Sequence, residues 1–411
     1  NTTGASNVAV GFSALANNTT AANNVAMGRD ALFTNTTGTS NVAVGYSALV
    51  FNTTASNNTA VGHKALYANT TGASNTAVGI EALLSNTTAN DNSAFGRRSL
   101  NFNTTGASNT AIGLECLYSN TTGANNSALG VGALVNNTTA SYNTAVGYQA
   151  AYSNTTGADN TAMGTAALYP NTTGNYNAAF GSASLRQNTT GSSNTALGQA
   201  ALNQNTTASN STAVGYQAGY TNTTGLQVTL IGSRAGYSNT TANYTVAIGD
   251  QAMYSNTTGV DNTATGAGAL YFNTTGASNT SFGRQALFSN TTASNNTAVG
   301  YQAGYSQVAA SNYATYFGNL AGENTTGTGN TFIGANAGNG NGAGRLVTSG
   351  SKNTILGGYD GNQGGLDIRT GSNNVVLSDG DGAPAYINRP YTVFQTGGRY
   401  TSENPLYEGA A

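Results

Sequence analysis

The feature that most constrains this chain is a short phrase that restarts at a fixed interval. With Asn1 as unit position 1, the triplet N-T-T returns at residues 18, 35 and 52 and at every seventeenth residue up to Asn290. This makes 18 units without an insertion or deletion, with the consensus N-T-T-G/A-x-x-N-T-A-V-G-x-x-A-L-x-x. A fixed period of this length indicates stacked repeats, so the 411 residues are not divided into ordinary globular domains.

Glycine at unit position 11 indicates a fixed demand on the backbone. It fills this position in all 18 units, beginning with the residues Gly11, Gly28, Gly45, Gly62 and Gly79. A glycine recurring at one place implies either a positive φ or the close approach of a neighbouring chain segment. We therefore predict a corner of the backbone at these residues.

The remaining positions predict an all-β parallel β-solenoid, or β-roll, of about 18 coils, each formed by one 17-residue unit. Positions 7–10 (N-T-A-V) suit a short strand, positions 13–16 suit a second one, and N-T-T-G suits a turn. One coil offers only the apolar side chains of positions 9, 10 and 15, too few to offset the entropy of ordering the whole coil. Stacked coils share a continuous core and ladders of backbone hydrogen bonds.

The predicted core is thin, because it consists of Ala, Val and Leu with little aromatic mass. The alanines of positions 9 and 14 are small enough for neighbouring chains to approach closely. We therefore expect a homo-oligomer, most simply a threefold bundle. Position 15 changes from Leu to Gly at Gly219, Gly236 and Gly304, each followed by Tyr, which suggests a register variant with the large side chain moved by one place.

Beyond the array of residues 1–306, the period weakens. Residues 307–323 form a degraded unit in which Gly318 falls one place late, and a good unit returns at Asn324, so 307–340 read as degenerate terminal coils. Residues 341–411 are rich in Gly and Asn and hold three of the four prolines, which favours a cap or a distal interaction region. Because the sequence opens at Asn1 inside a unit, we expect a signal or anchoring segment to precede it.

The unit resembles repeats of two known families. N-T-A-V-G at 75–79 and N-T-A-I-G at 109–113 resemble the S-V-A-I-G repeat in the heads of trimeric autotransporter adhesins, which are left-handed parallel β-rolls. NTFIGANAGNG (330–340), SKNTILGGYDGNQGG (351–365) and LDIRTGSNNVVLSDGDGAPAYINR (366–389) look like distal regions of bacteriophage tail-fibre proteins. The resemblance implies a left-handed, homotrimeric fibre.

Composition excludes several functions. Only 6% of the residues are charged, the net charge is −2, and the 12 Lys and Arg are scattered, which does not suit a nucleic-acid binder. No run of about 20 apolar residues predicts a membrane span. The single cysteine, Cys116, cannot form an intrachain disulfide.

The chain offers little for catalysis, metals or cofactors, and we predict none of them. The one histidine, His63, lies at the variable position 12 and reads as a surface residue, and Cys116 occupies an alanine position and reads as a small buried side chain. No Cys/His grouping or Asp-rich calcium repeat occurs. Asp379 and Asp381 read as a turn, and no paired-carboxylate cleft of a glycan-cleaving enzyme is suggested.

The N-T-T triplet is also an N-glycosylation sequon. Its alternative role is a turn whose side chains hydrogen-bond locally and stack into ladders. Further sequons begin at Asn57 and Asn243. The candidate acceptors of the N-T-T triplets are Asn1, Asn18, Asn35, Asn52, Asn69, Asn86, Asn103, Asn120, Asn137, Asn154, Asn171, Asn188, Asn205, Asn222, Asn239, Asn256, Asn273, Asn290 and Asn324.

The sequence therefore predicts a structural fibre: a rigid extracellular or virion rod that carries a binding end, with itself as partner and a cell-surface glycan or protein as receptor. The second hypothesis is a microbial adhesin or self-assembling extracellular filament, glycosylated on its sequons. A third is an ice-binding solenoid, since Thr fills position 8 in many coils, although Val8, Ser93 and Ala178 interrupt that row. Aromatic residues at variable positions could stack on sugars or simply cover the coil edge.

Overall fold

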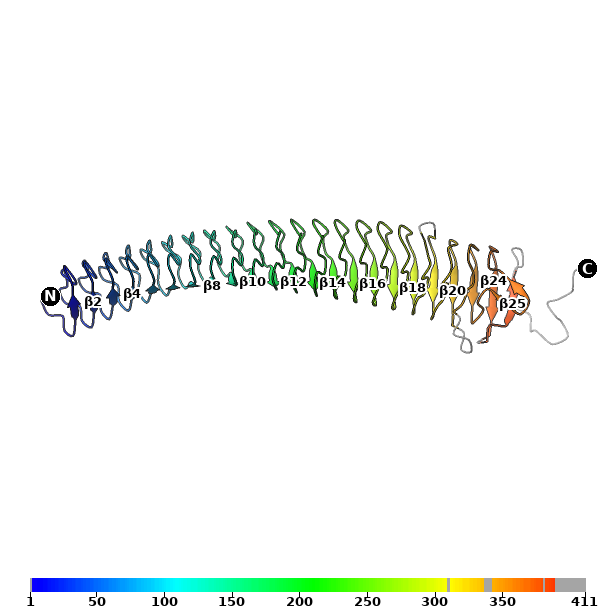
Figure 1. The fold of residues 1–411 in the computed structure, drawn as a ribbon, viewed down its shortest axis with the longest axis horizontal. Coiled ribbons are helices and arrows are strands. Elements are labelled where there is room, and N and C mark those ends of the chain that lie inside the picture. Colours follow the sequence, from blue (N-terminus) through cyan, green and yellow to red (C-terminus); the bar gives the residue numbers. More distant parts are fainter. Residues whose placement is uncertain (1, 309–310, 336–341, 380, 389–411) are drawn as a thin grey trace, which may run out of the picture.

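The chain folds as one long solenoid, in which every coil lies on the previous one. The computed structural model describes residues 2–308, 311–335, 342–379 and 381–388, and Figure 1 shows a gently curved rod with the first and last strands at opposite ends. All of its elements in these ranges are strands. The all-β solenoid fold predicted from the repeat is confirmed.

Each regular coil contributes one strand of three residues, at unit positions 8–10. The strands are β1 (Val8–Val10), β2 (Val25–Met27), β3 (Val42–Val44), β4 (Thr59–Val61), β5 (Thr76–Val78), β6 (Ser93–Phe95), β7 (Thr110–Ile112), β8 (Ser127–Leu129), β9 (Thr144–Val146), β10 (Thr161–Met163), β11 (Ala178–Phe180), β12 (Thr195–Leu197), β13 (Thr212–Val214), β14 (Thr229–Ile231), β15 (Val246–Ile248), β16 (Thr263–Thr265), β17 (Thr280–Phe282), β18 (Thr297–Val299), β19 (Thr315–Phe317), β20 (Thr331–Ile333), β21 (Thr354–Leu356), β22 (Asn362–Gln363), β23 (Leu366–Asp367), β24 (Val375–Ser378) and β25 (Pro384–Asn388).

The strands pair in parallel and in register along the whole rod. Thr59 pairs with Thr76 and Ala60 with Ala77, and the same alignment continues to β21 and then β24. The stack therefore has about 21 turns, somewhat more than the 18 coils expected. At about 4.8 Å between neighbouring strands, the rod is about 100 Å long.

The second strand predicted at positions 13–16 is absent from the described coils. These positions form turns, because the residues at positions 13 and 15 have positive φ, as at Lys64 (53°) and Leu66 (50°). Alternation of left-handed and right-handed backbone cannot extend into a strand. The turn is held by hydrogen bonds along the rod axis, such as Lys64 N to Tyr46 O at 2.9 Å and Leu66 N to Ala82 O at 3.0 Å.

The interior is narrower than predicted. Ala77 and Ala82, at positions 9 and 14, and Leu83, at position 15, are fully buried, whereas Val78 at position 10 points outward because alternate strand residues face opposite sides. The expected placement of position 10 in the core is therefore wrong. So is the idea that the small alanines admit a neighbouring chain, because they fill the inside of the coil itself.

The predicted backbone demand at the position-11 glycines is found. Gly79 has a φ of 139°, and a Cβ added there would lie 2.5 Å from the carbonyl oxygen of Gly96 in the next coil. Both reasons for glycine, the positive φ and the close approach of backbone, therefore apply at once.

Leu230 replaces alanine at position 9 and explains two of the glycines at position 15. A Cβ added to Gly219 or Gly236 would lie 2.7 Å or 2.6 Å from methyl carbons of Leu230. Tyr316 and Phe332 fill the core in the same way beside Gly304, Gly322 and Gly344. No register shift occurs here, so that prediction is wrong: the volume lost at position 15 is supplied by position 9.

The C-terminal coils keep the stack but not the period. Thr297 pairs with Thr315 rather than with Ala314, and Thr315 pairs with Thr331 rather than with Phe332. The sheet continues through β21 and β24 into the region predicted to be a cap, and β25 then pairs antiparallel with β24. Residues 389–411 of that region, Asn1, residues 309–310 and 336–341, and Gly380 lie outside the described residues.

Candidate functional site on the sides of the rod

An apolar column runs along the outer face of the sheet. It consists of the side chains at unit position 10 and their equivalents in the later coils. Its most exposed members are Val10, Met27, Phe95, Ile112, Leu129, Met163, Leu197, Ile231, Ile248, Phe282, Phe317, Ile333 and Leu356. Thr265 is the one polar residue at position 10 of the 18 units. An exposed apolar surface of this length is unusual for a monomer and indicates an interaction surface.

An aromatic ladder lies at unit position 16. The stacked rings are Tyr220, Tyr237, Tyr254, Tyr271, Phe288 and Tyr305, with ring centroids 5.0–5.3 Å apart from one coil to the next. Most of these pairs are parallel within 2–6°, but Tyr271 and Phe288 are inclined by 24°. The faces of the inner rings are covered by one another, which stabilises the coil edge.

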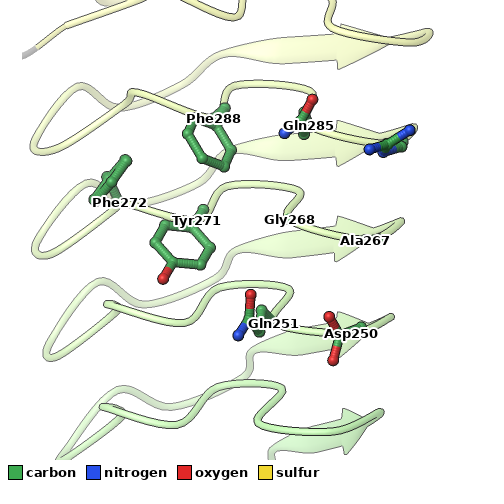
Figure 2. A pocket seen from close by; sticks show the side chains of 9 residues that line it. Asp250, Gln251, Ala267, Gly268, Tyr271, Phe272, Gln285 and Phe288 are labelled. Atoms are coloured by element: carbon green, nitrogen blue, oxygen red, sulfur yellow. The ribbon is translucent and has the colours of Figure 1, made fainter.

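A notch opens on the rod beside the inclined pair, with a cavity volume of about 370 Å³. Its floor is Ala267 and Gly268, and Tyr271, Phe272 and Phe288 line it from one side (Figure 2). Asp250 and Gln251 come from the preceding coil, and Arg284 and Gln285 come from the following coil. The notch therefore combines aromatic surface with two amides and two opposite charges.

The polar groups of the notch differ in their hydrogen bonds. Gln285 accepts from Gln302 Nε2 at Oε1, at 2.9 Å, so its own Nε2 is available as a donor. Figure 2 shows the Gln251 oxygen pointing toward the coil of Gly268. Asp250 and Arg284 form no ion pair with any residue in the described part of the chain.

The asparagines of the N-T-T triplets have a structural role. From Asn18 to Asn290 their side chains are buried. Asn86 Nδ2, for example, donates to Asn69 Oδ1 at 2.8 Å and to Ala89 O at 3.1 Å. N-glycosylation requires this nitrogen, so its burial argues against glycans on the folded array and favours the alternative ladder of side chains.

A second buried asparagine ladder, which the sequence analysis did not identify, lies at unit position 7. Asn58 Oδ1 accepts from the backbone N–H of Asn75, and Asn58 Nδ2 donates to Gly72 O, both at 2.9 Å. The ladder lapses at Ser211, Val228 and Thr245, in the coils around Leu230. Near-invariance of Asn at position 7 was the available signal.

The sequon of Asn324 differs from the others. Thr325 occupies the buried ladder position, where its Oγ1 donates to Val347 O at 3.0 Å, and Asn324 is exposed. Only the first turn of this unit is displaced by one place. The strand Thr331–Ile333 and Gly334, with a φ of 139°, keep the register expected from Asn324. Asn57 is also exposed, whereas Asn243 is half-buried and accepts from the Leu226 N–H at 2.7 Å.

Candidate reactive groups are scattered. His63 is exposed and stacks on Tyr46 with centroids 5.4 Å apart, and Cys116 is buried in an alanine position, where burial raises the pKa of its thiol to about 12. Asp379 Oδ1 accepts from the N–H groups of Asp381 and Ala383, which is a turn. The described residues contain no group of three or more His, Cys, Asp or Glu side chains able to hold a metal.

The threonine row is less regular than an ice-binding face needs. Position 8 faces outward with position 10, as at Thr76 and Val78, so hydroxyl and methyl groups share the sheet surface. However, Val and Ala interrupt the first row, and the adjacent column mixes Val with Met27, Phe95 and Leu129 of unequal length.

Among the residues with a described structure, no helix is long and apolar enough to cross a membrane. Comparison of the whole chain finds no matching family model and no matching curated protein.

Proposed function

We propose that this chain is a structural fibre protein: an extracellular or virion-borne rod that projects a binding end from a surface and assembles with copies of itself along the apolar column. The observation that carries this proposal is the continuity of the stack. A parallel ladder of about 21 turns gives length and stiffness, which are the properties a fibre needs.

The apolar column supports self-association. Its side chains recur once per coil. A partner surface that contacts each of them in the same way must therefore have the same spacing along the rod axis. A second copy of this chain has that spacing. Symmetric assembly of copies, as a threefold bundle or another closed oligomer, covers the column on each chain.

The proposal is tested by particle mass and electron microscopy. We expect the wild-type chain to form an oligomer of rods about 100 Å long. Replacing three neighbouring column residues, Phe95→Asp, Ile112→Asp and Leu129→Asp, places charges in the interface and should give monomers with an unchanged circular dichroism spectrum.

The matched control carries the same three charges in the same three coils. Thr88, Thr105 and Thr122 are exposed at the turn edge, so their replacement by Asp should leave the oligomer intact. A wild-type chain that is monomeric by mass photometry at micromolar concentration would contradict self-association along the column.

The alternative function is a microbial cell-surface adhesin or a self-assembling extracellular filament, and the filament requires end-to-end contacts between rods. Electron micrographs of the wild-type protein distinguish the two proposals. A fibre gives discrete rods or bundles of one length, whereas a filament gives continuous rods that grow with protein concentration.

A further inference from the structure

We propose that the notch at Gly268 is a binding site for a neutral hexopyranose unit of a glycan. This goes beyond the rod function, because it gives the side of the rod a ligand of its own. It does not depend on the oligomeric state, so the two proposals can fail separately.

The notch arises from several departures from the repeat that meet in one coil, which begins at Asn256. Ala267 and Gly268 are small where the neighbouring coils carry Asp, Arg or Gln. Phe272 makes this the one coil of the array with aromatic residues at both positions 16 and 17. Together these changes remove bulk at the floor and add a ring at the wall.

The polar groups around the notch suit the hydroxyls of a sugar. The following coil offers donors, the guanidinium of Arg284 and Nε2 of Gln285. The preceding coil offers acceptors, the carboxylate of Asp250 and Oε1 of Gln251. A sugar hydroxyl can donate and accept at once, so a ring of hydroxyls between the two coils can satisfy both sets.

The charge balance favours a neutral sugar. An acidic sugar gains from Arg284 but is repelled by Asp250, and an amino sugar meets the reverse situation. A neutral hexopyranose avoids both penalties and still receives charge-assisted hydrogen bonds from both groups.

The aromatic wall supplies the apolar contact. Phe272 meets Tyr271 at 77° and Phe288 at 81°, so its ring stands across the ladder rather than within it. Phe272 is 45% exposed, which leaves apolar surface for the C–H groups of a sugar ring. The cavity of about 370 Å³ falls in the range of ligand pockets.

The test fills the notch without disturbing the coil. Gly268→Gln introduces the residue that Gln251 and Gln285 already provide at this unit position, where they have φ values of 54° and 57°. A Cβ at Gly268 would lie 3.4 Å from its nearest neighbours. The fold should therefore tolerate it.

The matched control is Gly132→Gln. Gly132 occupies the same unit position in another coil, has a φ of 68°, and offers similar space, with the nearest side-chain carbon 3.5 Å from an added Cβ. Arg284→Gln and Asp250→Asn test the polar groups separately.

The probes are the methyl glycosides of D-glucose, D-galactose and D-mannose, with methyl glucuronide and glucosamine as charged comparisons. Binding is measured by saturation-transfer NMR and calorimetry on the full chain. We expect at least one neutral glycoside to bind, with affinity lowered about tenfold or more by Gly268→Gln, since tenfold corresponds to about 1.4 kcal/mol. Gly132→Gln should leave binding unchanged.

Three outcomes would overturn the proposal: no binding of any neutral glycoside, equal binding by the wild type and Gly268→Gln, or stronger binding of a charged comparison sugar. None of these outcomes bears on the length or oligomeric state of the rod.

Discussion

Two kinds of coil fill the same narrow interior in different ways. In the regular coils, Ala77 at position 9 faces Leu83 at position 15, both fully buried. In other coils, which we call the exchanged coils, position 9 holds a large residue and the adjacent position 15 is glycine. The large residues are Leu230, Tyr316 and Phe332. The comparison teaches that the solenoid fixes the volume of each core layer rather than the identity of each residue.

The exchange also carries a polar difference. Regular coils hydrogen-bond most of their buried amides through two asparagine ladders, although Asn143 Nδ2 has no partner in the described structure. In and beside the exchanged coils, Thr245 Oγ1 and the Tyr316 hydroxyl form no hydrogen bond there. Packing is thus conserved between the two kinds of coil, whereas unpaired buried polar groups are more frequent in and beside the exchanged coils.

The prediction with the largest expected effect tests whether side-chain volume at position 9 replaces the volume missing at position 15. Leu230→Ala should lower the free energy of unfolding by about 2–5 kcal/mol, because Gly219 and Gly236 cannot fill the cavity. Adding Gly219→Leu and Gly236→Leu should recover most of this loss by restoring the regular layer. Thermal unfolding, and hydrogen exchange in the three coils of residues 205–255, measure both changes.

The control is Gly236→Leu with Leu230 retained. Here the added side chain is overpacked against Leu230 and should cost about 1–3 kcal/mol. If the triple variant is no more stable than Leu230→Ala alone, the two positions do not exchange volume.

The second prediction compares the stability effect of replacing a buried ladder asparagine, Asn86, with that of replacing Asn324, which lies outside the ladder. Asn86→Ala removes hydrogen bonds to Asn69 and Ala89 and deprives Asn103 Nδ2 of one of its two acceptors, all in the buried ladder. We expect a loss of about 1–3 kcal/mol in chemical denaturation.

Asn324→Ala is the matched change in the irregular coils. The Asn324 side chain is exposed and donates to Arg345 O at 3.0 Å, so the same measurement should change by less than about 0.5 kcal/mol. An equal loss of unfolding free energy in both variants would show that burial of the asparagine in the ladder does not stabilise the fold.

The prediction with the smallest expected effect concerns the unpaired buried hydroxyl of Tyr316 in an exchanged coil. Tyr316→Phe removes a buried hydroxyl that has no hydrogen-bond partner, and should raise the free energy of unfolding by about 1 kcal/mol. Phe332 already fills the corresponding position in the next coil.

Tyr359→Phe is the control for this change. The Tyr359 hydroxyl donates to Leu366 O at 2.7 Å, so its removal should lower the melting temperature, while Tyr316→Phe raises it. A decrease in both variants would mean that the Tyr316 hydroxyl is satisfied in solution.

The amino-acid sequence by itself determined the solenoid, the length of its coil and the glycine corner. These follow from the period, since identical units can share a core only by stacking, and from Gly at position 11, where side chains would meet the next backbone. The buried ladder was present as the alternative to glycosylation, because a repeated N-T-T triplet fits both roles.

Only the tertiary structure decided which side each residue faces and what the glycines at position 15 mean. Val78 and Ala77 are both apolar, and hydrophobicity alone does not tell which of two adjacent strand residues is inside. Leu83 at positive φ and Leu230 beside Gly236 depend on contacts between neighbouring coils. The 17-residue period already places Asp250, Gly268 and Arg284 on three successive coils, but only the structure shows that they line one cavity.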